Sequence, residues 1–495
     1  MSVLVILIVC VPLAAAIVTW YAPVNVSQNL TIGVGVASFA MALVLLPRAS
    51  HATITAGGLL RVDALSMVFL LAVAFLYATT SLFAKGYLAL GDGANARRYG
   101  RRFYAGLNLF CWSLIVVPLV NGLALLWVAI EITTVISALL VAIDDTEGAS
   151  EAAWKYVLLA SLGLGIALFA TIMMYYAGTA VFGASYSLSY STLLSGALHF
   201  HPVIVRFAFV LAVLGYGTKM GLFPVHTWLP DAHSEAPTPV SALLSGALLA
   251  VSFYAILRFF QIAERSLGPT FPRDVLLVFG IATLLLASLY LLSQRDMKRL
   301  LAYSSVEHMG ILAIGMSFGA SIAVVGVLLQ VLAHAAAKGT AFYGAGSMVR
   351  KFGTKDMTKI RGAVSALPWS GPMFVLAVLA LSAMPPFGIF RSEFYIVEGG
   401  LSEPRDVIVA IFVVLVVMAF FGLSWFTTET MLSEPPSSAS VLEGDVLVVT
   451  KGEVSNWIVA AMVVGLVALL ILGVHPPASL SHLLDRAAAE LGSVR

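Results

Sequence analysis

The chain has 495 residues, of which 60% are hydrophobic and only 11% are charged. Soluble globular proteins carry about 25% charged residues, and the mean hydropathy here is +0.99. Composition therefore excludes a soluble protein and predicts an integral membrane protein. The formal net charge of +2 gives no basis for nucleic-acid binding. The two cysteines both lie in apolar stretches and provide no disulfide framework.

Apolar stretches long enough to cross a bilayer recur along the whole chain. A spanning helix needs about 20 mostly apolar residues, so the sequence predicts an all-α polytopic protein, a single integral membrane domain over 1–495. The fourteen expected spans lie near 3–20, 30–47, 62–84, 104–120, 122–143, 152–178, 203–228, 239–262, 274–293, 299–317, 321–347, 367–399, 405–429 and 456–474.

Two of these spans are interrupted by proline and glycine. The seventh is broken after Lys219 by Gly221 and Pro224, and the twelfth is broken by 384–388, MPPFG. Proline removes a backbone donor and clashes with the preceding turn, so neither helix continues undisturbed. Paired interruptions indicate inverted repeats. Since these two lie five spans apart, we expect two five-helix repeats, 104–262 (spans 4–8) and 274–429 (spans 9–13).

Basic residues predict the orientation. They gather between spans 3 and 4, between 9 and 10, and between 11 and 12, which all fall on one side of the membrane. The positive-inside rule places that side in the cytoplasm and both termini outside. Arg258, Arg265 and Arg273 are expected in an opposite, outer loop and weaken the assignment slightly. An acidic loop at about 430–456 is expected on the cytoplasmic side.

A few spans carry an ionisable residue near their middle. A charge there costs at least ~3 kcal/mol, so it indicates a functional site with a partner. Together these residues predict a polar axis along the bilayer midplane. They are Glu131 in span 5, Lys219 in span 7, His308 in span 10, His334 and Lys338 in span 11, and Glu393 after the break in span 12.

Such an axis suits proton transfer. Histidine changes its charge near neutral pH, and burial favours a neutral lysine whereas a nearby carboxylate favours a charged one. Moving the carboxylate would then make the lysine hold or release a proton. Our hypothesis is that Glu131 and Lys219 form this pair. A purely structural ion pair is the alternative for both residues, and a satisfied core histidine is the alternative for His308 and His334.

Other ionisable residues have plainer interpretations. A polar run after the seventh-span break either supports proton entry or caps the broken helix where it meets water; it comprises His226, Asp231, His233 and Glu235. Glu307 is expected to be structural or interfacial, and Lys298 to anchor a cytoplasmic loop. Arg61 and Asp63 are expected to form a local pair near the outer surface.

Three motifs resemble one family. TKMGLFPVHTWLPDAHSEAPTPVSALLSG, DMKRLLAYSSVEHMG and AHAAAKGTAFYGAG occur in the order typical of antiporter-like subunits of respiratory complex I, multi-subunit cation/proton antiporters and group 4 [NiFe] hydrogenases. The likeness covers roughly 104–430, and SSVEHMG and SAMPPFGIFRSEF look most like hydrogenase-4 component F. The resemblance implies the roles proposed above for Glu131, Lys219 and the residues of the axis, with Glu393 handing protons onward. It also matches Lys155 to a basic position at the start of span 6, which makes Lys155 a candidate for proton entry or support.

The resemblance implies partners. The chain has no phosphate-binding loop, dinucleotide fingerprint or Cys/His cluster, so it is expected to hold no cofactor and no redox centre of its own. The resemblance implies other membrane subunits and a peripheral arm carrying a [NiFe] centre and iron–sulfur clusters. It also implies a prokaryotic cytoplasmic (inner) membrane and transport of protons, with Na⁺ as an open alternative.

One position departs from the family pattern. Complex I relatives usually carry a lysine in span 8 where Ala250 stands here. Water, Ser252 or His308 would have to bridge the resulting gap between Lys219 and His334. Three functions therefore remain open: a proton-translocating subunit of a hydrogenase or formate hydrogenlyase type complex, a subunit of a Na⁺/H⁺ antiporter, and a scaffold that moves no ions.

Overall fold

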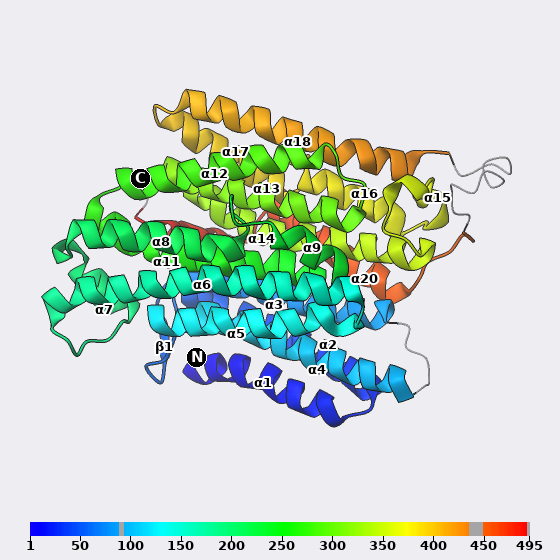
Figure 1. The fold of residues 1–495 in the computed structure, drawn as a ribbon, viewed down its shortest axis with the longest axis horizontal. Helices are drawn as coiled ribbons and strands as arrows, with labels where there is room; N and C mark the ends of the chain where they lie inside the picture. The colour runs from blue at the N-terminus through cyan, green and yellow to red at the C-terminus, as the bar shows by residue number, and fades with distance from the viewer. Residues whose placement is uncertain (89–93, 435–448, 493–495) are drawn as a thin grey trace.

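The computed structural model describes residues 1–88, 94–434 and 449–492. The chain forms a bundle of long helices that run roughly along the longest axis of the molecule (Figure 1). Helices are favoured because hydrocarbon offers no partner for backbone N–H and C=O groups, which a helix satisfies internally. In the described part, twelve helices are long and apolar enough to cross a membrane. The expected loop near 430–456 lies partly outside the described residues.

The helices before the middle of the chain are α1 (Ser2–Tyr21), α2 (Val24–Ala49), α3 (Ala64–Tyr87), α4 (Ala94–Val116), α5 (Leu123–Val141), α6 (Glu147–Phe182), α7 (Tyr190–Gly196), α8 (Pro202–Met220), α9 (Trp228–Glu235), α10 (Thr238–Leu243) and α11 (Leu249–Leu267). Those after it are α12 (Thr270–Leu291), α13 (Met297–Phe318), α14 (Ser321–Phe352), α15 (Ala363–Ala366), α16 (Ser370–Leu381), α17 (Gly388–Ser402), α18 (Asp406–Leu432), α20 (Asn456–Val474) and α21 (Ala478–Glu490).

The twelve apolar helices do not include all fourteen expected spans. The tenth span is α13, which has 22 residues but carries Ser304, Glu307 and His308 among its apolar side chains. The twelfth is divided into α16 and α17, of 12 and 15 residues. Both segments are less apolar or shorter than a simple spanning helix because they carry polar groups or a break. The helix α13 packs against α12, α14 and α18, whereas α16 and α17 pack against α14, α18 and α20.

Both predicted interruptions are present. The helix α8 stops at Met220 because Gly221 adopts φ +92°, a left-handed conformation in which glycine ends a helix. The second break separates Leu381 from Gly388. A further irregularity had no signal in the sequence: a π-helical turn, Leu244–Leu248, joins α10 to α11 within the expected eighth span. The arrangement of these helices as two inverted repeats remains a prediction.

A small hairpin departs from the purely helical expectation. Strands β1 (Ile54–Ala56) and β2 (Leu60–Val62) pair antiparallel, with Thr55 opposite Arg61. The turn between them uses Gly57 and Gly58 at positive φ, which glycine adopts without steric cost. The hairpin leads directly into α3, whose first turn is capped by Asp63.

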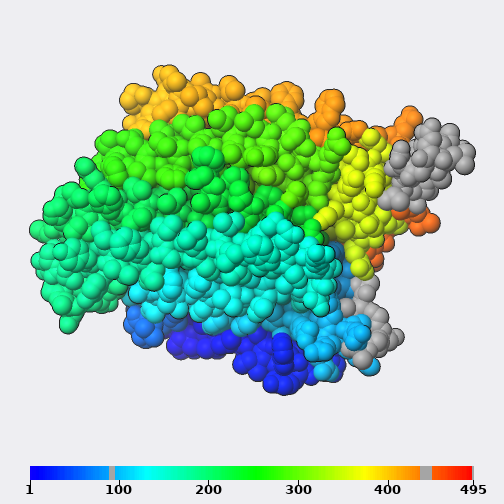
Figure 2. Space-filling view, in the orientation of Figure 1, coloured from blue at the N-terminus to red at the C-terminus, as the bar shows by residue number. Residues whose placement is uncertain are grey.

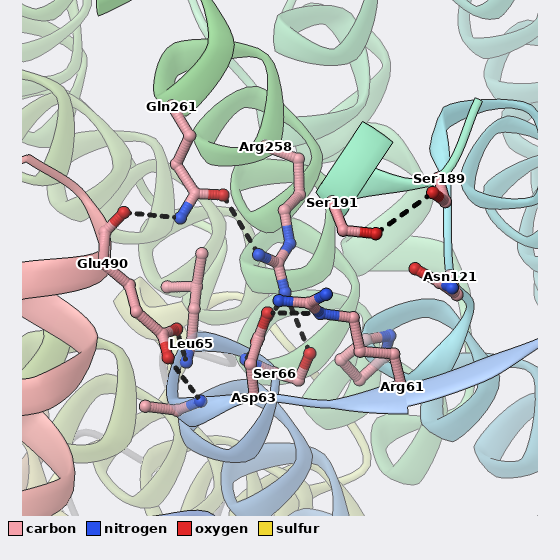
Figure 3. A network of polar contacts seen from close by, with 12 residues as sticks. Arg61, Asp63, Leu65, Ser66, Asn121, Ser189, Ser191, Arg258, Gln261 and Glu490 are labelled. Atoms are coloured by element: carbon pink, nitrogen blue, oxygen red, sulfur yellow. Dashed lines mark hydrogen bonds and ion pairs between the residues drawn. The ribbon is translucent and has the colours of Figure 1, made fainter. Parts of the chain in front are cut away.

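A buried ion pair joins two distant helices beside this hairpin (Figure 3). The guanidinium of Arg258 donates from Nη2 to Asp63 Oδ1 at 2.6 Å, and each side chain is 1% exposed. Arg61 also pairs with Asp63 as expected, at 3.0 Å. The expectation of Arg258 in an outer loop was wrong, because α11 continues past it to Leu267 and its charge is neutralised inside the protein.

The same network holds the last helix. Gln261 accepts a hydrogen bond from Arg258 at 3.0 Å and donates one to the backbone oxygen of Glu490 at 2.8 Å. The Glu490 carboxylate accepts from the backbone N–H groups of Ala64 and Leu65 at the start of α3. Polar contacts thereby link α3 near the start of the sequence, α11 in its middle and α21 near its end.

We expect Arg258→Leu to lower the free energy of unfolding by about 3–5 kcal/mol, because it leaves Asp63 buried without its main counter-charge. Denaturant titration in detergent would measure this change. Arg61→Leu is the matched control: Arg61 is 19% exposed, and such partly exposed pairs contribute at most about 1 kcal/mol. Equal effects of the two substitutions would contradict the role assigned to Arg258.

The network also predicts a pH dependence of stability. Burial opposes ionisation of Asp63, but Arg258 and Arg61 outweigh it and hold the pKa of this carboxyl below its ordinary 3.8. A lowered pKa stabilises the fold above the ordinary value, and this contribution is lost as the pH falls below it. Burial and the Asp63 charge raise the pKa of Glu490. Ionisation of Glu490 therefore lowers the stability of the fold as the pH rises, which is opposite to the effect of Asp63. In a Glu490→Gln background, we therefore expect Asp63→Asn to remove the acid-induced loss of stability seen with Asp63 present; an unchanged acid profile would refute this.

Candidate functional site

The Lys219 ammonium is held entirely by α5. Lys219 lies in the last turn of α8 and is fully buried. It donates to the carbonyl oxygen of Ile130 at 2.8 Å and to the hydroxyl of Thr133 at 2.6 Å, and also to the hydroxyl of Thr134. An ammonium group has three N–H donors. Each of the three has an acceptor here, and none of those acceptors is a carboxylate.

Glu131 lies one residue beyond Ile130, beside this acceptor group. Its Oε1 accepts a hydrogen bond from Ser161 of α6 at 3.4 Å, while its Oε2 is buried with no hydrogen-bond partner among the described residues. The structure therefore brings Lys219 to the backbone next to Glu131 but forms no ion pair between them within 4.0 Å. The proposed switching of this pair remains a prediction.

A second lysine is held in the same way. Lys338 on α14 is fully buried and donates to the carbonyl oxygen of Leu301 at 2.9 Å and to the hydroxyl of Ser304, both on α13. Lys219 and Lys338 are thus each hydrogen-bonded to one carbonyl oxygen and to at least one hydroxyl group of a neighbouring helix. These neutral acceptors can stabilise a charge without fixing it permanently, as a carboxylate would.

The helices α13, α14 and α17 meet at a polar cluster centred on Gln330. The amide nitrogen of Gln330 on α14 lies 3.0 Å from His308 Nδ1 on α13 and donates to Glu393 Oε1 on α17 at 3.3 Å. The His308 and Glu393 atoms themselves are 3.9 Å apart. Ser392 donates to the oxygen of the same amide. Gln330 thus bridges a histidine and a carboxylate that the sequence singled out separately.

His334 packs against His308. Their rings are 5.0 Å apart between centroids in an edge-to-face arrangement. Neither ring nitrogen of His334 has a partner among the described residues, and Nε2 of His308 is likewise unpaired there. Buried polar atoms usually have a hydrogen-bond partner. These nitrogens therefore mark a place where water or a proton can be accepted. Glu307, expected to be structural or interfacial, is buried, and its Oε2 is also unpaired.

Two serines connect the eighth expected span to the neighbourhood of Lys338. Ser245, in the π-helical turn, lies 2.7 Å from Ser305 of α13 between hydroxyl oxygens. Ser305 donates to the carbonyl oxygen of Leu301, which also accepts from Lys338. Ser252, one of the bridges suggested by the sequence, instead donates within its own helix to Leu248. The contact from span 8 to Lys338 therefore passes through Ser245.

The broken end of α8 approaches the same point. A Cβ placed on Gly221 would lie 3.8 Å from a methyl group of Val306, the neighbour of Ser305. Lys219 precedes this glycine by two residues. Lys219 on α8, the Ser245–Ser305 pair and Lys338 on α14 therefore all lie close to α13 or to a residue that contacts it.

The polar run after the break divides into two groups. Asp231 pairs with Lys155 at 3.7 Å and with Arg299, all at least partly exposed, and Glu235 pairs with Lys355 at 2.7 Å. This group forms an ion-pair network of at least partly exposed side chains from α6, α9, α13 and the segment after α14. Asp231 and Lys155, expected separately as entry or supporting residues, are thus brought together.

The other group is buried. His226 has an unpaired Nδ1, whereas His233 contacts the carbonyl oxygen of Leu229 through Nδ1 at 2.8 Å and has no partner at Nε2. Lys298 is not in a loop as expected. It lies in the first turn of α13, 5% exposed, and donates to the carbonyl oxygens of Ser234 and Ala236. These carbonyl oxygens have no helical N–H partner because α9 ends at Glu235, so they can accept hydrogen bonds from the Lys298 ammonium group.

Sequence reasoning missed the neutral members of the site. They include Thr133, Thr134, Ser245, Ser304, Ser305, Gln330 and Ser392. A buried glutamine in the middle of a spanning segment was the one available signal, because polar side chains there require partners. The hydroxyl residues gave none, since serine and threonine can bond to their own helix. Among the described residues, no group of three or more His, Cys, Asp or Glu side chains could hold a metal ion.

Comparisons with known proteins agree with this architecture. The transmembrane family described as NADH:quinone oxidoreductase/Mrp antiporter matches residues 120–419. A hydrogenase-4 component F homolog of Methylacidiphilum infernorum (isolate V4) is 35% identical over 394 residues, 78% of this chain and 81% of the relative.

Solved structures share the fold. A chain of the Mrp complex from Dietzia sp. DQ12-45-1b superposes with a TM-score of 0.86 at 20% identity, covering 99% of this chain and 97% of that one. A chain of the membrane-bound sulfane sulfur reductase, an archaeal respiratory membrane complex, gives 0.82 at 20% identity, covering 99% and 98%. With a family match over most of the helical bundle and a relative of this similarity, the chain belongs to the NADH:quinone oxidoreductase/Mrp antiporter family of antiporter-like membrane subunits.

Proposed function

We propose that this chain translocates protons as a membrane subunit of an energy-converting complex. The observation that carries the proposal is the row of buried ionisable side chains Lys219, Lys338, His334, His308 and Glu393, in which both lysines are hydrogen-bonded to neutral oxygens and Gln330 bridges His308 and Glu393. Protons enter near the ion-pair network at the end of α9 and reach Lys219. They continue through Lys338, His334 and His308 to Glu393 and leave from there.

In this route the hydroxyl groups of Ser245 and Ser305 form the link between span 8 and Lys338, because Ala250 has no side chain that can carry a proton. Hydroxyl groups both donate and accept hydrogen bonds, so Ser245 and Ser305 can pass a proton between them and on to water beside Lys338 without becoming charged. The Leu301 carbonyl only accepts hydrogen bonds, so it positions Ser305 and Lys338 and does not itself carry the proton. Water completes the connection from Lys219. This route accounts for the presence of a small apolar residue at position 250, which is buried and makes no polar contact of its own.

A [NiFe] hydrogenase or formate hydrogenlyase type complex is the partner that we infer. The similarity to a hydrogenase-4 component F homolog supports this choice. The [NiFe] centre and iron–sulfur clusters then belong to a peripheral redox arm. The alternative is a Na⁺/H⁺ antiporter without such an arm, which the likeness to a chain of an Mrp complex supports. A mild-detergent pull-down separates them: a [NiFe] large subunit and iron–sulfur proteins support the first, and only small membrane subunits support the second.

We expect Lys219→Ala to abolish coupled proton movement while the complex still assembles, because the proton-carrying group is lost. Proton uptake by proteoliposomes during turnover, with assembly checked by native electrophoresis, tests this. Lys219→Arg should also fail, since arginine keeps its proton at any pH that proteins tolerate. Lys359→Ala, at an exposed position, is the control. Wild-type coupling in Lys219→Ala would refute the route, and an assembly defect with normal coupling in Glu131→Gln or Lys338→Met would favour a scaffold.

The serine link makes a separate prediction. Ser245→Ala removes the hydroxyl that contacts Ser305, and we expect the rate of coupled proton transfer to fall about tenfold or more, as for loss of one positioned proton-transfer group. Ser252→Ala is the matched control, because it removes a buried hydroxyl of the neighbouring helix that bonds only within that helix. Equal proton-transfer rates in the two variants would exclude Ser245 from the route.

A further inference from the structure

A groove opens on the outside of the bundle along α1, away from the row of ionisable residues. It encloses about 740 Å³ between α1, α4 and α5. Apolar side chains line most of it, and Ile17 and Leu139 on opposite walls are 60% and 70% exposed. In Figure 2, α1 lies at the margin of the molecule beside α4 and α5. The groove therefore faces the surroundings of the bundle.

Four arginines stand at one end of this groove. Arg97, Arg98, Arg101 and Arg102 lie in the first turns of α4 and line, with Trp20, a hollow of about 390 Å³. Trp20 and Arg102 line the groove as well, so the two spaces are continuous. All four side chains are exposed, and none makes an ion pair or hydrogen bond with any described residue.

The length of the groove matches one leaflet of a bilayer. Its wall on α1 extends from Leu13 to Tyr21, about 12 Å at 1.5 Å per residue. Half of the hydrocarbon core of a bilayer is about 15 Å. Trp20 and Tyr21 lie at the arginine end, where aromatic rings typically mark the membrane–water interface. The apolar part thus lies at the depth of acyl chains and the arginines at the depth of headgroups.

We propose that this groove binds an anionic phospholipid, with its acyl chains along α1 and α5 and its phosphate between the arginines. The charges favour this occupant: four guanidinium groups surround the hollow, against one carboxylate, Asp145, in the groove lining. The neighbouring Asp144 is already engaged by the Tyr99 hydroxyl at 2.6 Å. Guanidinium groups bind phosphate through paired hydrogen bonds, and basic pockets between membrane helices bind anionic headgroups.

The test uses the complex reconstituted in nanodiscs of phosphatidylcholine with graded amounts of phosphatidylglycerol or cardiolipin. Native mass spectrometry after detergent release counts the lipids that stay bound. We expect the wild type to retain anionic lipid preferentially. The double variant R98Q/R101Q should lose this preference by about thirtyfold, equivalent to about 2 kcal/mol at ~1 kcal/mol for each arginine near the membrane surface.

Two further variants make the test specific. R295Q/K359Q removes the same charge from exposed positions away from the groove and should retain the lipid. Leu139→Trp fills the apolar part of the groove without replacing an arginine and should reduce the amount of lipid that stays bound. This variant tests the lipid site independently if R98Q/R101Q fails to assemble. Retention that is equal in wild type, R98Q/R101Q and Leu139→Trp would overturn the proposal.

A photo-crosslinking residue in place of Leu139 identifies the occupant directly. Crosslinks to phospholipid in the intact complex would support the lipid site. Crosslinks to another protein subunit, with no lipid adduct, would overturn it and assign the groove to a subunit interface.

Discussion

A charge inside a membrane protein must be solvated by the protein itself, and this constraint organises the interior of the bundle. Water and lipid headgroups are out of reach at that depth, and an unsolvated ammonium would be deprotonated or would destabilise the fold. The chain meets the constraint in two ways. At the end of the bundle that carries the β1–β2 hairpin, Arg258 and Asp63 neutralise each other directly. Along the central row, carbonyl and hydroxyl oxygens surround Lys219 and Lys338 instead.

These two solutions suit different tasks. A carboxylate in contact with a guanidinium fixes both charges, and here it joins α3, α11 and, through Gln261, α21 into one unit. Neutral oxygens hold a lysine in place but leave its protonation responsive to a third group. In the proposed route Glu131 takes that role; it follows Ile130, whose carbonyl oxygen accepts a hydrogen bond from Lys219. The Arg258–Asp63 pair thus helps to join α3, α11 and α21, whereas the lysines of the proposed transport row have neutral partners.

Helix breaks place these groups. The α8 helix ends at Met220, one residue after Lys219, and the following Gly221 lies close to Val306 of α13, the neighbour of Ser305. The π-helical turn at Leu244–Leu248 carries Ser245 toward Ser305 in the span where relatives of complex I would place a lysine. Irregular backbone at membrane depth is tolerated only inside protein or beside water. In this chain the α8 break lies close to Val306, the neighbour of Ser305, and the π-helical turn carries the Ser245–Ser305 contact.

The sequence by itself determined the membrane class, the positions of most helices, both helix breaks and the charged members of the row. Those features depend on local properties: apolar length, proline and glycine, and the cost of a charge in hydrocarbon. Tertiary structure alone decided that Lys219 contacts threonines and not Glu131, that Gln330 joins His308 to Glu393, and that Arg258 belongs to Asp63. Those contacts join residues on different helices, so they depend on how the helices rotate and pack, which the periodicity of one segment does not encode.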